Sequence, residues 1–108
     1  MVRGSHKYSV SPKEDRTVDG IVFASKKEAR RYCELKLLEK AGEITNLSLQ
    51  PKFPCVVNGK KVCGYVADFR YETPDGVVIE DVKGFKTRIY RLKKKLVEAL
   101  YNFEIVET

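Results

Sequence analysis

Residues 65–84 read YVADFRYETPDGVVIEDVKG, and this stretch decides the fold. Two runs rich in aromatic and β-branched residues flank the segment TPDG at 73–76, which is typical of a tight turn between antiparallel strands. Asp68 interrupts the first run, and the second run ends in the tripeptide DVK at 81–83. The stretch therefore predicts a β-hairpin that carries acidic and basic side chains within an otherwise apolar sheet.

The register of this hairpin decides which charged side chains meet. With a two-residue loop at 74–75, Asp68 faces Asp81 directly, and Lys83 lies further along the same face. A type I turn followed by a glycine bulge would shift the pairing by one residue, so that Asp68 shares its face with Glu80 and Lys83 points away. We favour the first register because only it gathers two carboxylates and a lysine.

Two carboxylates that face each other across a sheet repel unless a divalent cation lies between them. Carboxylates favour Mg²⁺ or Mn²⁺, and such an ion can bind a phosphodiester oxygen, orient a water and stabilise the leaving oxygen. A lysine beside it can position the attacking water or neutralise developing charge. The three residues thus predict hydrolysis of a nucleic-acid backbone, whereas an ordinary cross-strand ion pair between Asp68 and Lys83 is the structural alternative.

The flanking sequence predicts the rest of an α/β domain. Residues 17–24 form a short hairpin or kinked strand, and residues 25–40 form a helix that opens with the capping-box pair Ser25 and Glu28 and stops at Gly42. Strands follow at 44–50, 53–57, 61–72 and 77–84, with a two-residue turn at Asn58-Gly59.

A second helix is expected at 87–101, with a core stripe of Ile89, Leu92, Leu96 and Leu100, and a last strand at 103–106. The element order is β-α-βββ-α-β, an α/β fold in which two helices flank a mixed β-sheet. Residues 1–16 are expected to be a flexible N-terminal arm, followed by a single domain at 17–108.

Composition narrows the function classes. The chain has 108 residues, 21 Lys+Arg against 15 Asp+Glu, and a formal charge of +6, which suggests a polyanionic partner. No apolar run approaches the ~18–20 residues that cross a bilayer, and no secretion signal is recognisable, so we expect a protein without a membrane partner. His6 and the cysteines cannot make a zinc site, and Cys33, Cys55 and Cys63 are expected to be small core residues.

The hairpin resembles the motif of the PD-(D/E)XK nuclease superfamily, with Asp68 and then Asp81-Val82-Lys83. The segments FASKKEA at 23–29 and QPKF at 50–53 look like a phage-encoded branch related to Holliday junction resolvases. The resemblance covers roughly residues 18–106, and one departure is Ala67, where the motif usually has a proline. It implies a restriction-endonuclease-like fold and a cytoplasmic setting in a bacterial host cell, encoded by a phage or prophage.

The resemblance also implies roles. Asp68 and Asp81 match the catalytic, metal-binding carboxylates, the carbonyl of Val82 matches a further metal ligand, and Lys83 matches the catalytic lysine. Glu28 matches an acid that joins the metal shell, although it could merely complete the helix cap. Gln50 lies where some relatives place a polar active-site residue, and it is equally compatible with a hydrogen bond at a strand end.

Basic residues gather around this expected site. They are predicted to bind the phosphate backbone, and they are Lys26, Lys27, Arg30 and Arg31 on the first helix and Lys86, Arg88, Arg91 and Lys95 after the DVK motif. Solvent-facing helix charges are the structural alternative. The aromatic residues Tyr65, Phe69, Tyr71 and Phe85 are expected to pack in the core or in hinges and not to stack on bases.

The sequence thus predicts a Mg²⁺- or Mn²⁺-dependent DNA endonuclease that acts on branched DNA, without a small-molecule cofactor. A Holliday junction needs two symmetric cuts, which a homodimer supplies most simply. A nicking endonuclease of the same fold, of the mismatch-repair or transposon-end type, is one alternative. A non-catalytic basic DNA-binding module is the other.

Overall fold

The computed structural model describes residues 11–108; residues 1–10, with His6 and most of the predicted arm, lie outside the described part. A short 3₁₀ helix, η2 (Lys13–Arg16), stands where the sequence predicted the end of that arm. The Arg16 guanidinium donates to the carbonyls of Ser11 at 2.9 Å and of Phe23 at 2.6 Å. These bonds tie η2 to the segment that precedes the first long helix.

The first long helix begins and ends where the sequence predicted. After a small hairpin of β1 (Thr17–Val18) and β2 (Ile21–Val22), α1 spans Lys26–Lys40. The side-chain oxygen of Ser25 accepts the N–H of Glu28 at 3.1 Å and so satisfies a free donor of the first turn. Gly42 follows the helix with a φ of +81°, a conformation that favours glycine.

Four strands form one long, bent hairpin. β3 (Thr45–Leu49) and β4 (Lys52–Val57) run along one arm, and β5 (Lys60–Val66) and β6 (Phe69–Thr73) return along the other. The turn at Asn58-Gly59 has positive φ at both residues, 50° and 78°, which confirms the predicted two-residue hairpin.

The bend divides the strand that was predicted at 61–72, so that prediction is wrong. The pairs Leu49–Phe69 and Lys52–Val66 lie on either side of the bend. At the bend itself, the N–H of Gln50 donates to the carbonyl of Asp68 at 2.9 Å. The chain changes direction there because β5 pairs only with β4, and the two form a separate two-stranded ribbon. β6 instead pairs with β3 and β7 in the main sheet.

The main sheet has the strand order β3-β6-β7-β8, with β7 at Gly76–Asp81 and β8 at Ile105–Glu107. β7 pairs antiparallel to β6 and parallel to β8, so the sheet is mixed, as predicted. Phe69 pairs with Glu80 and Thr73 with Gly76, which is the favoured register of the 65–84 hairpin. The next pair along that register is Asp68 and Asp81.

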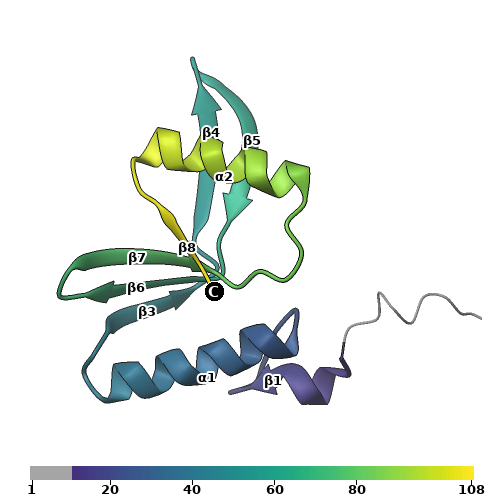
Figure 1. Ribbon diagram of the computed structural model, residues 1–108, viewed down its shortest axis with the longest axis vertical. Helices are drawn as coiled ribbons and strands as arrows, with labels where there is room; N and C mark the ends of the chain where they lie inside the picture. Colours follow the sequence, from purple (N-terminus) through teal and green to yellow (C-terminus); the bar gives the residue numbers. More distant parts are fainter. Residues whose placement is uncertain (1–10) are drawn as a thin grey trace, which may run out of the picture.

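Helices and strands cover both faces of the sheet (Figure 1). α1 lies along one face, over a core that includes Tyr32, Leu35, Phe69 and Tyr71. α2 (Arg88–Tyr101) and the β4–β5 ribbon lie on the other side, around a second core that includes Ile79 and Val97. The structure is therefore a mixed α/β domain in which the sheet around Phe69 and Ile79 is covered on both faces, whereas the turn end of β6 and β7 stays exposed.

The expected core stripe of α2 is wrong in part. Ile89 and Leu92 are 62% and 65% exposed and Leu100 is also exposed, whereas Val97 is fully buried. The helix carries two neighbouring apolar faces, and it packs against β4 and β5 with the face that holds Val97. Leu96, at the border of the two faces, is partly buried.

Two further expectations about buried side chains need correction. Among the aromatics, Tyr65, Phe69 and Tyr71 are buried as predicted, but Phe85 is 86% exposed because the loop that carries it leaves the sheet before α2 begins. Among the cysteines, Cys55 is buried and Cys63 half-buried, but Cys33 lies exposed on the outer side of α1. Within residues 11–108, neither helix has the length and apolarity to span a membrane.

Candidate functional site

Asp68 and Asp81 meet at the end of the β6–β7 hairpin. The backbone N–H of Asp68 donates to Oδ1 of Asp81 at 3.1 Å, and the N–H of Val82 donates to Oδ2 of Asp68 at 2.7 Å. The bend after Ala67 aims Asp68 toward this point, and the end of β7 supplies Asp81. Two acidic side chains are thus held together by backbone donors that neutralise neither charge.

Lys83 lies beside this pair, on the segment that leaves β7. Its backbone N–H donates to the carbonyl of Thr108 at 3.1 Å, and its carbonyl accepts a hydrogen bond from the Lys27 ammonium at 3.0 Å. Its own ammonium lies over the ring of Tyr90, 4.4 Å from the ring centre. The Tyr90 hydroxyl donates to Oε2 of Glu107 at 2.6 Å, so the ring under the lysine is itself fixed.

A small cavity of about 170 Å³ joins the predicted residues Glu28, Gln50 and Asp68. Glu28 comes from the first turn of α1 and is half-buried; its N–H is capped by Ser25. Gln50 is exposed at the bend and adopts a positive φ of 51°, which is uncommon outside glycine. The cavity therefore lies beside Asp68, with Glu28 and Gln50 in its wall.

Burial dominates the electrostatics of these three acids. Burial raises the pKa of Asp68 and that of Asp81, and Lys83 only partly offsets this. Burial and the neighbouring Asp68 charge raise the pKa of Glu28, while the Ala24 amide and Lys83 lower it. All three acids hold their protons more tightly than free carboxyls, as expected for buried carboxylates that a bound positive ion would stabilise.

The donor set fits a hard divalent ion in its chemistry. Among residues 11–108, no three His, Cys, Asp or Glu side chains are already gathered as a metal cluster, so the side chains would have to close around an ion. Oδ2 of Asp81 is nevertheless buried without a hydrogen-bond partner in the described part of the chain, which is unusual for a carboxylate oxygen. Asp68, Asp81, Glu28 and the carbonyl of Val82 offer the oxygen ligands that Mg²⁺ and Mn²⁺ prefer.

Glu80, next to Asp81, has a different role. It is fully buried on the α1 side of the sheet, where Arg31 binds both its oxygens at 2.6 and 3.0 Å. The hydroxyls of Tyr71 and Thr108 donate to it at 2.7 and 2.9 Å. These hydrogen bonds outweigh burial and lower the pKa of Glu80, so it remains charged and anchors α1 to β7.

The predicted basic residues fall into distinct groups. Arg31 forms ion pairs with Glu80 and Glu34, and Lys86 forms one with Glu107 at 3.0 Å. Lys27 donates to the backbone of Lys83. The remaining members are exposed, and they are Lys26 and Arg30 on α1 and Arg88, Arg91 and Lys95 on α2.

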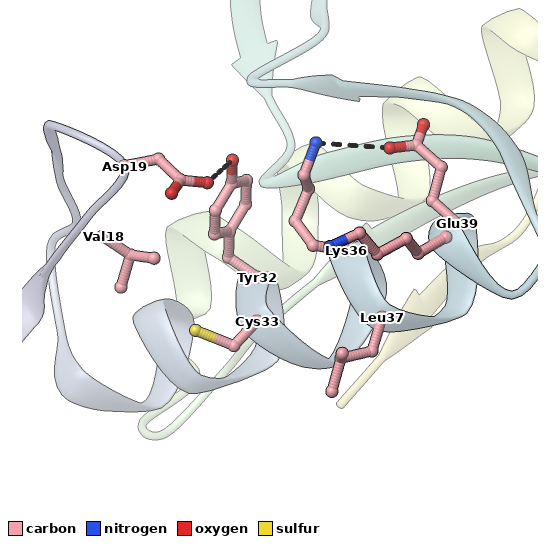
Figure 2. Close-up of a pocket in the computed structure, with 8 residues that line it drawn as sticks. Val18, Asp19, Tyr32, Cys33, Lys36, Leu37 and Glu39 are labelled. Carbon is pink, nitrogen blue, oxygen red and sulfur yellow. Dashed lines mark hydrogen bonds and ion pairs between the residues drawn. The ribbon is translucent and has the colours of Figure 1, made fainter.

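A larger cavity, of about 460 Å³, lies away from these acids on the outer side of α1 (Figure 2). Several of its polar side chains are already paired: the Tyr32 hydroxyl donates to Asp19 at 2.8 Å and Lys36 pairs with Glu39 at 3.4 Å. Most of its remaining surface is apolar. We therefore place the candidate site at the smaller cavity beside Asp68.

Sequence reasoning missed Tyr90, Glu107 and the role of Arg31. Tyr90 and Glu107 are separated by 17 positions and meet only because α2 returns the chain to β8 beside β7. No local pattern marks such a pair. The adjacent acids Glu80 and Asp81 did indicate two separate environments. Side chains alternate along a strand, so the two acids point to opposite faces of the sheet and each needs its own partner.

The comparisons with known proteins give a family and no activity. The chain matches, over residues 5–106, the model of a family described as "Protein of unknown function (DUF1064)", and it belongs to that family. No curated protein and no solved structure matches the chain.

Proposed function

We propose that this protein is a divalent-metal-dependent DNA endonuclease of the restriction-endonuclease-like fold that hydrolyses phosphodiester bonds in branched DNA. The observation that carries the proposal is the pairing of Asp68 with Asp81 at the end of a hairpin, with Lys83 two residues further on. The mixed sheet with a helix layer on each side is compatible with that fold.

The carboxylates and the lysine have separable tasks in such a reaction. Asp68, Asp81, Glu28 and the Val82 carbonyl would hold Mg²⁺ or Mn²⁺, which supplies Lewis acidity toward the scissile phosphate and lowers the pKa of water. Lys83, fixed over Tyr90, would orient the attacking water or stabilise negative charge on the phosphate. Gln50 at the cavity rim would contact the sugar-phosphate backbone.

The charge distribution supports a nucleic-acid substrate. Exposed basic side chains lie on the first two turns of α1 and along α2, the two elements that flank the acids. Phosphate groups are the natural partners of such side chains, and these contacts would offset the repulsion between the substrate and the three acids. A phage or prophage protein that works in the cytoplasm of a bacterial host would fit this function.

Action on a four-way junction would need two active sites. We propose that two copies of the chain supply them, since a two-fold dimer matches the symmetry of the junction. The β4–β5 ribbon leaves Val56, Val57 and Val62 exposed, and these apolar side chains are the candidate contact.

The test is a panel of end-labelled DNAs with and without Mg²⁺: a four-way junction, a flap, a nicked duplex and a linear duplex. The proposal predicts Mg²⁺-dependent cleavage of the junction well above that of the linear duplex. Cleavage only at nicks or flaps would favour the nicking endonuclease. DNA binding without any cleavage in Mg²⁺ or Mn²⁺ would show a non-catalytic binding module.

A further inference from the structure

The loop between β7 and α2 holds the most exposed large apolar side chain among those described. Phe85 is 86% exposed, and it follows Lys83 by two residues. Ile89 and Leu92, on the outward face of α2 just beyond it, are 62% and 65% exposed. We call these three residues the apolar edge of α2. Ile89 and Leu92 are neighbours on the helix surface at a spacing of three residues, and exposed large apolar side chains that lie together are typical of a binding site.

Positive charge borders this apolar edge. Arg88, Arg91 and Lys95 recur at intervals of three and four residues along α2, and together with Leu92 they line a groove of about 290 Å³. The first turn of α2 contains no acidic residue. A partner that matches this surface therefore offers apolar groups and negative charge together.

A second copy of the chain does not meet that requirement. A two-fold contact through this face would bring Arg88, Arg91 and Lys95 of both copies together, and these like charges would repel. Fully paired duplex DNA supplies the negative charge but keeps its bases stacked inside the helix. DNA with unpaired or unstacked bases supplies both features, since phosphates follow the basic residues and bases pack on apolar side chains.

We propose that Phe85 packs against an unstacked base of the DNA beside the bond to be cut, and thereby restricts the substrate to DNA that is open at that point. The inference rests on the proposed function, because Phe85 lies beside the segment that carries Lys83. It names the substrate class as DNA with an unpaired base or branch point next to the scissile phosphate. Ile89 and Leu92 extend the same contact.

The experiment uses the absence of tryptophan from the chain. Phe85→Trp introduces a single tryptophan, which can be excited selectively over the tyrosines of the chain, and Leu37→Trp is the matched control because Leu37 is 68% exposed on α1, outside this surface. Each full-length variant is titrated without metal with a forked DNA, an open four-way junction and a fully paired duplex. We expect the forked and junction DNAs to quench the tryptophan emission of the Phe85→Trp variant and the duplex to leave it unchanged. The emission of the Leu37→Trp variant should respond to none of the three DNAs.

Affinity provides the second measurement. Phe85→Ala should bind forked DNA about tenfold more weakly or worse, the range of a lost base–aromatic contact, while its duplex affinity stays within about twofold. Leu37→Ala should match the wild type on both DNAs. Equal loss on fork and duplex, an unchanged fork affinity, or conversion of a dimer to a monomer by Phe85→Ala would each overturn the proposal.

The outcome is separable from that of the proposed function. Wild-type cleavage of the junction in Mg²⁺, with no quenching of the Phe85→Trp variant by any DNA, would overturn only the base contact. Quenching of that variant by forked DNA, in a protein that cuts nothing in Mg²⁺ or Mn²⁺, would support the base contact and overturn the endonuclease proposal.

Discussion

Asp68 donates its backbone N–H to the carboxylate of Asp81, and receives on its own carboxylate the N–H of Val82. Each acid is thus oriented by the peptide backbone of the opposing strand end. These two hydrogen bonds hold the two acidic residues close together. Oδ2 of Asp81 is left buried without a hydrogen-bond partner within residues 11–108. Such an arrangement destabilises the folded chain unless a cation is bound, so removal of one charge should stabilise the metal-free protein.

Asp68→Asn should raise the melting temperature of the metal-free protein at pH 7. The pKa of Asp68 is raised by burial, so ionisation weakens the fold as the pH rises from the ordinary aspartate range through the raised folded pKa. The stability difference should therefore shrink when the pH falls below about 4, where the wild-type carboxyl is protonated as well. Thermal unfolding at several pH values measures it.

Asp75→Asn is the matched control, since Asp75 is exposed in the turn between β6 and β7. It should unfold like the wild type at every pH. A metal-free Asp68→Asn variant that is less stable than the wild type at pH 7 would contradict the interpretation that the buried charge of Asp68 weakens the fold.

Glu28→Gln separates the cap from the metal shell. Ser25 already caps the N–H of Glu28, and the glutamine can accept the same backbone bonds as the acid, so metal-free stability should change by less than about 1 kcal/mol. If Glu28 binds the ion, the Mg²⁺ concentration needed for half-maximal cleavage should rise about tenfold or more. Substitution of residues that support metal ligands weakens metal binding by about this factor. The measurement is cleavage by the variant and the wild type across a Mg²⁺ titration. If both need the same Mg²⁺ concentration for half-maximal cleavage, Glu28 only caps the helix.

The Arg31–Glu80 pair should determine stability and not DNA affinity. Arg31→Met leaves a buried, charged Glu80 without its main partner, and breaking such a pair destabilises a protein by about 3 kcal/mol or more. Because the pKa of Glu80 is lowered, the stabilisation is present above the ordinary glutamate pKa and is lost as the pH falls through the lower folded value. Urea unfolding at pH 7 and at pH 3 tests both points.

Arg30→Met is the control for Arg31→Met, because Arg30 is exposed one position earlier on the same helix. It should change the free energy of unfolding by less than about 0.5 kcal/mol. Equal effects of the two substitutions would contradict an anchoring role for Arg31.

The exposed basic residues of α2 should carry affinity for DNA. Replacing Arg88, Arg91 and Lys95 by alanine should weaken binding and lower the slope of log Kd against log salt by about 0.9 for each lost phosphate contact on duplex DNA. A variant that loses the same charge at the exposed Lys40, Lys60 and Lys61 serves as the control. An unchanged slope in the α2 variant would mean that this face is merely solvated.

The sequence predicts most of what is local in this fold. Both tight turns, the start of α1 at Ser25 and the hairpin register that brings Asp68 next to Asp81 follow from turn chemistry and strand alternation, and the structure has all of them. These features depend on residues within about twenty positions of one another, where register and capping leave few alternatives.

What the sequence did not predict depends on distant contacts. The break at Ala67-Asp68 arises because two halves of one β-rich run join different layers, which no residue in the run specifies. α2 carries two apolar faces, and only the packing against β4 and β5 selects the one with Val97 and leaves Ile89 exposed. The support of Lys83 by Tyr90 was missed for the same reason.

The most direct test of the central claim is cleavage of a labelled four-way junction in Mg²⁺ by the wild type, Asp68→Asn, Asp81→Asn and the control Asp75→Asn, with metal-free binding of the same junction measured in parallel. We expect both site variants to lose cleavage by about 100-fold or more, at least the loss seen when partners of metal ligands are removed. Their junction binding should be equal to or tighter than that of the wild type, because a repulsive charge is gone. Asp75→Asn should cleave and bind like the wild type. Undiminished cleavage by Asp68→Asn or Asp81→Asn would contradict the assignment of the site.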